Sequence, residues 1–379
     1  MSKLLINEPK EIGNILIKNR LVRSATFERM ASEDGSVNNE LVEFYKVLAK
    51  GGVGLIVTGL SYVHPSGHGY YNQIGIDRDD LIPGLKRISD TIHENGDGCK
   101  AVIQLAHNGR QSFMIGLEPI APSAILEPMS NNMPRKMTID EIKEVIIAFA
   151  EATSRGKEAG FDAIQLHAAH GYLLSEFLSP HTNKRTDEYG GSIENRTRII
   201  KEIYNETVKR VGKDFPIMIK MNADDYIKGG INIHESKKIA SILSKMGFAA
   251  IEISGGMWEV TLLSKEELGW MPAMLPESRV DILSKDKEAY HLPYAREIKP
   301  LINKPLILVG GLRSLEVIEE ILKEGNADFI ALSRPLIREP DLPNKWFKGI
   351  GELKSECISC NGCVGSVLQG KLQCIQKIS

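Results

Sequence analysis

The stretch IQLHAAHGYLLSEFLSPHTNKRTDEYGG, residues 164–191, begins as an apolar run and then presents His167, His170 and Tyr172 within six residues. Two imidazoles and a phenol are costly to bury without partners, because an unpaired polar group in an apolar site costs several kcal/mol. Polar side chains gathered directly after a hydrophobic strand therefore predict a functional site. The fold follows from how often this strand pattern recurs in the rest of the chain.

Short apolar runs of this kind alternate with amphipathic helical patterns along most of the sequence. Near-continuous hydrophobic runs are typical of parallel strands that are covered on both faces. The predicted strands are residues 21–25, 54–59, 100–106, 162–167, 216–221, 249–254, 305–311 and 328–333. The predicted helices are residues 39–50, 80–95, 139–159, 192–211, 234–246, 293–300, 314–324 and 335–349, with Thr138, Ser192 and Ser314 as N-caps. Eight strands, each followed by a helix, predict a (β/α)8 TIM barrel, which is an α/β fold.

The competing fold is a doubly wound open sheet, which binds a dinucleotide through a G-x-G-x-x-G turn after its first strand. That turn is absent here. Gly310 and Gly311 instead lie at the carboxyl end of the seventh strand, and Ser333 and Arg334 lie at the carboxyl end of the eighth. Barrels commonly bind phosphate after strands seven and eight, so this placement favours the barrel.

Two long loops interrupt the alternation of strands and helices. Residues 107–137 follow the third strand and residues 255–292 follow the sixth, each at the strand end where barrel active sites lie. Loops of this length in a compact domain are usually lids or binding loops. We therefore expect a barrel domain over residues 1–350 and a Cys-rich C-terminal extension over residues 351–379.

Composition excludes several classes of partner. Of the 379 residues, 42% are hydrophobic and 25% charged, as in ordinary soluble proteins, and the formal net charge is −2. This charge gives no basic field that would attract nucleic acid or an anionic membrane. No apolar run approaches the roughly 20 residues that span a bilayer, and the N-terminus lacks the pattern of a signal peptide. We therefore expect a cytoplasmic protein with no membrane partner.

Five segments together resemble the Old Yellow Enzyme family of flavin-dependent ene-reductases. They are LIKNRLVRSA (16–25), IQLAHNGR (103–110), HAAHGYLLSEFLSPHTNKRTDEYGGSIENR (167–196), VGG (309–311) and ALSRPLIREP (331–340). The C-terminal cysteines resemble the branch that includes 2,4-dienoyl-CoA reductase and trimethylamine dehydrogenase. The resemblance implies a TIM barrel with FMN, reduction by NADH or NADPH, and hydride delivery to the activated C=C bond of a small-molecule substrate. Relatives are often homo-oligomers, which we expect here too.

The resemblance also implies which residues hold the flavin. Gln104 would hydrogen-bond its pyrimidine edge, and Lys220 would place a cation beside N1 and O2, where many relatives have Arg. Lys supplies the charge without the planar fork of Arg. Further flavin contacts are expected from Ser24, Ala25 and Thr26 along the ring and from Gly310, Gly311, Ser333 and Arg334 at the phosphate.

The same resemblance assigns the substrate side. His167 and His170 would donate N–H groups to the substrate oxygen, and Tyr172 would give a proton to the α-carbon. Two other interpretations of the histidines stay open, namely a metal site and a purely structural pair. Phe27 stands where the best-known relatives carry Cys or Thr beside the flavin, so their tuning of the redox potential does not transfer. We expect Phe27 and Trp258 to line the substrate pocket.

The last four cysteines follow the spacing C-x₂-C-x₂-C-x₁₀-C. Four thiolates so spaced suit a [4Fe–4S] cluster or a zinc ion, and unligated thiols are the remaining interpretation. The residues concerned are Cys357, Cys360, Cys363 and Cys374. A cluster there would allow exchange of electrons with a partner protein. Two further functions therefore stay open beside ene-reduction: an amine-type dehydrogenase that passes electrons through the cluster, and a non-catalytic flavin module for electron transfer.

Overall fold

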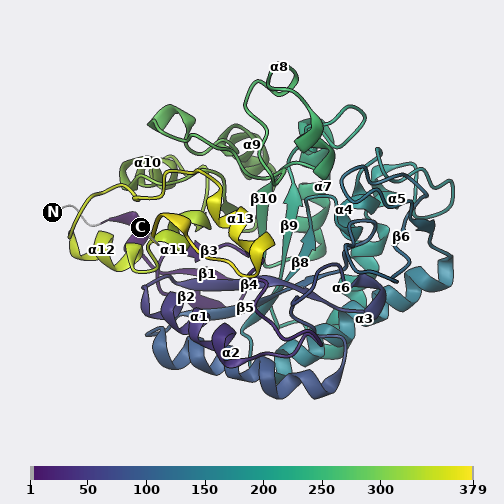
Figure 1. Cartoon of the computed structure of the whole chain (residues 1–379), viewed down its shortest axis with the longest axis horizontal. Coiled ribbons are helices and arrows are strands. Elements are labelled where there is room, and N and C mark those ends of the chain that lie inside the picture. Colours follow the sequence, from purple (N-terminus) through teal and green to yellow (C-terminus); the bar gives the residue numbers. More distant parts are fainter. Residues whose placement is uncertain (1–3, 378–379) are drawn as a thin grey trace.

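The computed structural model describes residues 4–377 and shows a closed barrel of eight parallel strands surrounded by helices (Figure 1). Neighbouring strands follow the order β10-β11-β12-β3-β4-β5-β8-β9, which closes on itself. The TIM barrel predicted from the sequence is therefore confirmed. The barrel strands are β3 (Leu21–Arg23), β4 (Leu55–Tyr62), β5 (Lys100–Ala106), β8 (Ala163–Ala168), β9 (Ile217–Asn222), β10 (Ala250–Ser254), β11 (Leu306–Leu308) and β12 (Phe329–Leu332).

Helices follow each barrel strand and cover the outside of the barrel, as the alternation of the sequence predicts. They are α1 (Asn39–Lys50), α2 (Ile82–Asn95), α3 (Ile139–Glu158), α4 (Leu173–Leu178), α5 (Ile193–Arg196), α6 (Arg198–Val211), α7 (Ile233–Met246), α9 (Leu292–Ile298), α10 (Leu315–Lys323), α11 (Arg334–Arg338) and α12 (Leu342–Lys348). Two of the predicted helices are each divided in the structure, one into α5 and α6 and one into α11 and α12.

Two of the three predicted N-caps are confirmed. The Thr138 hydroxyl accepts from the backbone N–H of Glu141 in a full capping box, and Ser192 accepts from the backbone N–H of Asn195. Ser314 does stand at the N-cap position of α10, but its side chain accepts no capping hydrogen bond there. Its hydroxyl instead donates to Glu288 at 2.5 Å.

The inside of the barrel changes from apolar to polar along its axis. Its lower part is filled by an apolar cluster that includes Val57, Val102 and Phe329. The hairpin of β1 (Lys10–Ile12) and β2 (Ile15–Ile17) adds Ile12 and Ile17 to this cluster from below. Packed side chains are the usual content of such barrels. The polar inward-facing residues lie nearer the carboxyl ends of the strands, and they form the floor of the site described below.

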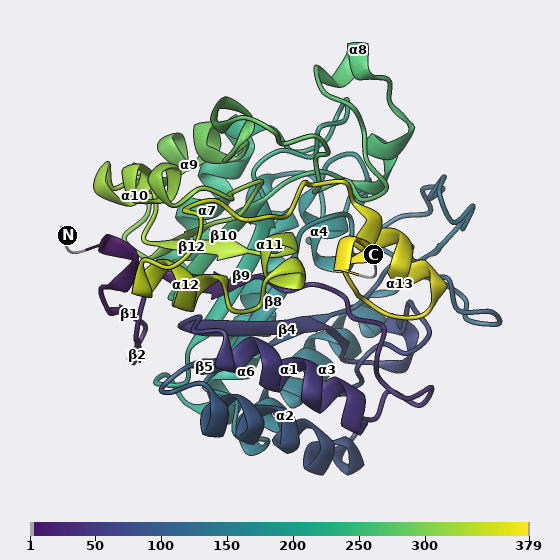
Figure 2. The same ribbon diagram turned by 60° about the vertical axis from the view of Figure 1, so that its left-hand side comes forward.

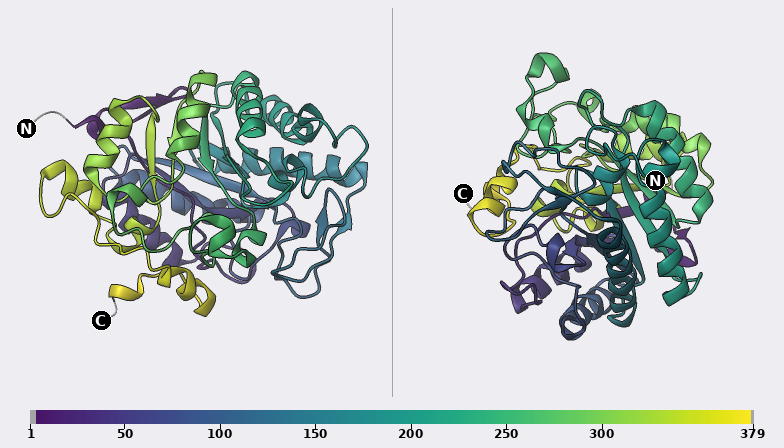
Figure 3. Two further views of the ribbon diagram at one scale, coloured as in Figure 1. Left: turned by 90° about the horizontal axis from the view of Figure 1, so that it is seen from above. Right: turned by 90° about the vertical axis from the view of Figure 1, so that its right-hand side faces the viewer.

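The two predicted long loops leave the barrel at its carboxyl end. The first contains the short strands β6 (Ile120–Ala121) and β7 (Arg135–Lys136), and the second contains α8 (Lys265–Leu268), which stands out from the body of the molecule (Figures 2 and 3). The C-terminal segment with α13 (Gly362–Gln369) lies against the N-terminal part of the chain (Figure 2). There Arg29 Nη1 donates to the carbonyl oxygen of Val367 at 2.9 Å. No helix within residues 4–377 is both long enough and apolar enough to cross a membrane.

Candidate active site

A cavity of about 830 Å³ lies at the carboxyl ends of the barrel strands. A volume of this size is in the range of cofactor and substrate pockets, and its place is that of barrel active sites. The cavity brings together every flavin and substrate residue predicted from the sequence. These are Ser24, Ala25, Thr26, Phe27, Gln104, His167, His170, Tyr172, Lys220, Trp258, Gly310, Gly311, Ser333 and Arg334. The role of each residue stays a prediction.

His167 and His170 are both buried neutral imidazoles. Burial lowers the pKa of each well below the usual range, and the nearby charge of Lys220 lowers it further. The centroids of the two rings are 5.1 Å apart, and the ring planes are nearly perpendicular. His170 adopts a left-handed backbone (φ +62°), with its Nε2 2.8 Å from Ser254 Oγ. His167 Nδ1 is buried and has no hydrogen-bond partner among the described residues, so this atom could bind a polar group in the cavity.

Tyr172 lies at the start of α4 with its ring 4.8 Å from that of His167. Burial raises its pKa well above the usual range, while a hydrogen bond with Tyr70 acts in the other direction. The hydroxyl oxygens of Tyr70 and Tyr172 are 3.0 Å apart. Tyr172 therefore remains protonated at any physiological pH, so it can act as a proton donor.

The floor of the cavity holds a cation and an amide that are tied to buried partners. Lys220 Nζ is 3.0 Å from Ser24 Oγ and 3.2 Å from a carboxylate oxygen of Glu252. Gln104 Nε2 donates to Gln165 Oε1 at 2.7 Å. The side chains of Gln165 and Glu252 lie below the floor, and the sequence pattern did not predict a role for either. Each stands in an apolar strand, and only the barrel register shows that it points inward.

The end of the cavity at which a phosphate is predicted contains a glycine that no other residue could replace. Gly310 has φ +128°, and a Cβ atom there would lie 2.8 Å from His291 Nδ1 and 2.9 Å from a ring carbon of Tyr290. The backbone therefore has room only for a residue without a side chain. Arg334 donates to the carbonyl oxygen of Arg279 at 2.8 Å and also to the side chain of Asn361, so it joins the second long loop to the C-terminal extension.

The side of the cavity at which substrate is predicted is lined by a row of four aromatic rings. Phe27 packs on Tyr70 with ring centroids 5.0 Å apart, Tyr70 stacks on Phe113 at 5.6 Å, and Phe113 contacts Trp258 at 5.8 Å. Phe27 therefore lies in the wall of the pocket beside Tyr172, and its contact with substrate stays a prediction. Tyr70 and Phe113 were missed because each lies in a loop, where no periodic pattern marks it.

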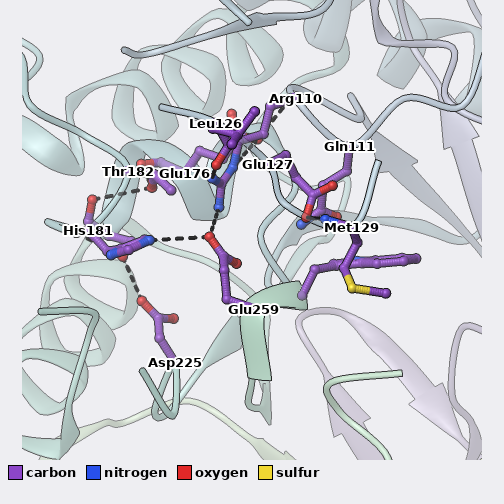
Figure 4. Close-up of polar contacts among 12 residues, drawn as sticks. Arg110, Gln111, Leu126, Glu127, Met129, Glu176, His181, Thr182, Asp225 and Glu259 are labelled. Atoms are coloured by element: carbon purple, nitrogen blue, oxygen red, sulfur yellow. Dashed lines mark hydrogen bonds and ion pairs between the residues drawn. The ribbon is translucent and has the colours of Figure 1, made fainter. Parts of the chain in front are cut away.

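A buried charge network joins the two long loops behind this wall (Figure 4). Arg110 of the first loop is fully buried, and its Nη2 lies 2.5 Å from Oε1 of Glu259 in the second loop. His181 Nε2 approaches the same oxygen at 3.2 Å. Burial would raise the pKa of Glu259, but the hydrogen bond from His181 and the charge of Arg110 outweigh burial and lower it to about 2. Glu259 follows Trp258 directly, so this network anchors the outer end of the aromatic wall.

The four C-terminal cysteines gather beside the main cavity. All of them line one small pocket, and Cys363 also lines the main cavity. None of the five cysteines forms a disulfide bond, and burial raises the pKa of Cys357 and Cys363. Within residues 4–377, however, no three His, Cys, Asp or Glu side chains converge as ligands of a metal ion. The cysteines therefore share one place in the fold, and the cluster predicted for them is not shown.

Comparison with known proteins identifies the family. Residues 6–352 match the model of the "NADH:flavin oxidoreductase / NADH oxidase family". The chain is 38% identical over 359 residues to an NADH oxidase of Thermoanaerobacter brockii, covering 93% of this chain and 52% of that protein. The curated relatives it matches first are thus about twice as long as this chain.

Solved structures agree with this match. A 2-naphthoyl-CoA reductase complex superposes with a TM-score of 0.85 at 30% identity, over 94% of this chain and 54% of that chain. A histamine dehydrogenase from Rhizobium sp. 4-9 superposes with a TM-score of 0.84 at 29% identity, over 97% of this chain and 51% of that chain. An old yellow enzyme homologue from Zymomonas mobilis superposes with a TM-score of 0.76 at 26% identity, over 92% of this chain and 94% of that chain. The family resemblance seen in the sequence is confirmed: the chain belongs to the NADH:flavin oxidoreductase / NADH oxidase family, whose enzymes are flavin-dependent oxidoreductases.

Proposed function

We propose that the protein is an FMN-dependent ene-reductase that acts on α,β-unsaturated carbonyl compounds. One NADH or NADPH and one proton are consumed for each C=C bond that is reduced to CH–CH. The observation that carries this proposal is the pairing of two neutral imidazoles with a protonated phenol in one cavity. When bound, FMN supplies hydride transfer from the nicotinamide to the β-carbon of the substrate.

The residues of the cavity floor and the glycine turn fit this cofactor. Gln104 and Lys220 present an amide and a cation toward one region of the cavity, as a flavin pyrimidine edge requires. Gly310 and Gly311 line the cavity without side chains, so a phosphate could approach their backbone closely, and Arg334 adds a positive charge at that end. These residues would bind and orient the flavin within the cavity.

His167 and His170 would bind the carbonyl oxygen of the substrate. Hydride arrival at the β-carbon moves negative charge onto that oxygen, and N–H donors held in place stabilise the charge most strongly in a site that excludes water. Neutral imidazoles suit this role because each can donate one N–H group. The unpaired Nδ1 of His167 is one atom that such a substrate, or a neighbouring group, would satisfy.

Tyr172 would then donate its hydroxyl proton to the α-carbon. Its raised pKa keeps the proton in place until a carbanion-like carbon, which is a stronger base, is formed. Tyr70 is hydrogen-bonded to the Tyr172 oxygen and so orients the phenol. Replacing Tyr172 by Phe should slow substrate reduction by roughly 10²–10⁴-fold, the usual contribution of a general acid.

An anaerobic half-reaction experiment tests the proposal. The flavin absorbance of the purified protein should bleach on addition of NADH or NADPH and return on addition of 2-cyclohexenone. In Tyr172→Phe the bleaching should persist and the return should slow. Tyr204→Phe, on the outer helix α6, is the matched control and should change neither step. A protein that cannot be loaded with FMN, or equal loss of both half-reactions in Tyr172→Phe, would contradict the proposal.

Amine oxidation is the second candidate, because the cavity also contains a carboxyl group beside the aromatic wall. Glu277 lines the cavity, and burial raises its pKa against the opposing charges of Lys220 and Arg334. Aromatic faces and a carboxylate are the partners that an ammonium group prefers. Anaerobic bleaching of the flavin by trimethylamine or histamine, with no return on addition of an enone, would select this candidate. Absence of turnover with either class would point to a non-catalytic electron-transfer module.

We further propose that Cys357, Cys360, Cys363 and Cys374 ligate a [4Fe–4S] cluster. Support comes from their spacing and from their shared pocket next to the main cavity. About four iron atoms and four acid-labile sulfides per chain, with loss of both in Cys360→Ser, are the expected result. One zinc ion per chain, or four freely titratable thiols in protein purified without air, would each contradict the cluster.

A further inference from the structure

A single carboxylate lies at the centre of the polar layer beneath the cavity floor. Glu252, on β10, is completely buried. Its Oε1 accepts a hydrogen bond from Ser24 Oγ at 2.6 Å and lies 3.2 Å from Lys220 Nζ. Its Oε2 accepts from Gln165 Nε2 at 2.8 Å. Glu252 therefore contacts two residues of the floor, Ser24 and Lys220, directly. It connects to the third, Gln104, through the side-chain amide of Gln165.

The barrel register explains why these side chains meet. Gln104 and Gln165 are cross-strand neighbours on β5 and β8, and Lys220 and Glu252 are neighbours on β9 and β10. Parallel strands with the same face turned inward bring such pairs into contact inside the barrel. Gln104 and Lys220 border the cavity, whereas Gln165 and Glu252 are fully buried beneath them.

The carboxylate fixes the direction of the hydrogen-bond chain. An ionised carboxylate only accepts, so Gln165 must turn its NH₂ group toward Glu252. The carbonyl oxygen of Gln165 then faces Gln104, which must donate its own NH₂ group to it. The carbonyl oxygen of Gln104 is thereby left for the cavity. An acceptor at that place suits the N3–H donor of a flavin pyrimidine ring.

The same carboxylate offsets the charge of the cation in the floor. Lys220 and Glu252 form an ion pair from which water is excluded. The two imidazoles that face Lys220 are neutral, and the other charged groups lining the cavity are Glu277 and the arginines Arg29, Arg313 and Arg334. Without Glu252, Lys220 would have no carboxylate in direct contact, and its positive charge would act more strongly on the cavity.

We propose that Glu252 is a positioning residue that lowers the reduction potential of bound FMN by neutralising Lys220, and that Gln165 relays its orientation to Gln104. The proposal rests on the proposed function in that FMN occupies this cavity with its pyrimidine edge over the floor. An uncompensated cation near that edge would stabilise the electron-rich reduced ring. A polar layer below the floor thus sets the driving force of the reaction above it.

Glu252→Gln tests the charge, since it keeps the shape of the side chain. The FMN potential, measured by equilibration with a reference dye, should rise. Sulfite should bind the oxidised flavin roughly tenfold more tightly, the effect of one charge over about 10 Å at an effective dielectric of about 20. Lys220→Met should change both quantities in the opposite direction. Glu127→Gln alters a fully buried carboxylate of the first long loop and should change neither.

Gln165→Leu tests the relay separately, because it breaks the chain to Gln104 and leaves the charges unchanged. FMN should then dissociate several-fold more readily, as fluorescence titration of the released flavin measures, while the potential stays near that of the unaltered protein. Unchanged FMN affinity in Gln165→Leu would overturn the relay.

An unchanged or lower potential in Glu252→Gln would overturn the assigned role of Glu252. Thermal melting of the apoprotein would reveal whether Glu252→Gln folds. If it does not, the double variant Lys220→Met/Glu252→Gln removes both members of the ion pair, and its sulfite binding is compared with that of Lys220→Met. Tighter sulfite binding in the double variant supports the proposal, and equal or weaker binding overturns it. Failure of the unaltered protein to bind FMN would instead refute the proposed function.

Discussion

Glu176 should make the protein less stable as the pH rises from 5 to 8. Its carboxyl group is fully buried on α4, and its Oε2 has no hydrogen-bond partner among residues 4–377. Glu259 takes the close ion pair with Arg110, so Glu176 lies 3.8 Å from the guanidinium and receives only a backbone N–H bond at 2.9 Å (Figure 4). Burial therefore dominates and raises the pKa of Glu176 to about 8, against the lowering effect of Arg110.

The size of the effect follows from proton linkage. Below the unfolded pKa of about 4.5 the group is protonated in both states, and its contribution to stability is fully present. As the pH rises the unfolded chain ionises first, so the folded state loses stability until the pH passes the folded pKa. At 1.36 kcal/mol per pKa unit, the loss between pH 5 and pH 8 amounts to about 3 kcal/mol. For a chain of 379 residues this corresponds to a change in Tm of about 4 °C.

Glu176→Gln removes this titration and keeps the shape of the side chain. Thermal unfolding of the FMN-loaded variant and unaltered protein should therefore be followed at several pH values between 5 and 8. Across that range the free energy of unfolding of the variant should rise by about 3 kcal/mol relative to that of the unaltered protein. Contacts that the substitution removes at every pH do not affect this pH-dependent change. Glu144→Gln, an exposed substitution on α3, is the control. Parallel pH profiles for Glu176→Gln and unaltered protein would refute the reasoning.

Two further predictions concern the phosphate end and the loop network. Gly310→Ala should weaken FMN binding by at least about tenfold in fluorescence titration, because the added Cβ would press on His291. Gly98 also has a positive φ, but a Cβ there would have no neighbour within 4 Å, so Gly98→Ala is the control for backbone strain alone. Glu259→Gln should lower stability at pH 7 by roughly 3–5 kcal/mol, because it leaves the buried charge of Arg110 without its partner. In unaltered protein the stabilisation by Glu259 should be lost as the pH falls from about 4.5 toward 2, and denaturant unfolding of the variant should lack that acid-dependent part.

The strand pattern predicted the barrel because every barrel strand is buried on both faces and so reads as a continuous apolar run. Residues that directly follow such runs, such as His167 and Arg334, could be placed at one end of the barrel from the order of the strands alone. The hairpin of β1 and β2 was missed, although Gly13 and Asn14 form a two-residue turn typical of hairpins, because each strand has only three residues. Short elements carry too few residues for periodicity to show.

The partners of the site residues were beyond the sequence for a different reason. Glu252 stands within AAIEIS, where alternation cannot say which face of a strand turns inward until the barrel closes. Ser314 stands at the N-cap position that its residue type predicts, but its side chain makes no capping bond and donates to a carboxylate distant in sequence, Glu288. Contacts of this kind depend on tertiary position, which local patterns do not encode.

Closure of the barrel has a consequence for how the protein is made. The last barrel strand pairs with the first, with Ala331 beside Val22, and the adjoining Thr26 and Ser333 hydroxyls lie 2.8 Å apart. During synthesis, the first strand therefore has no partner on that edge until the ribosome has added some three hundred more residues. Such long-range pairing slows folding and leaves an open sheet edge exposed to other chains. Newly synthesised protein should therefore be prone to aggregation until residue 333 has left the ribosome, and the cavity is complete only after that point.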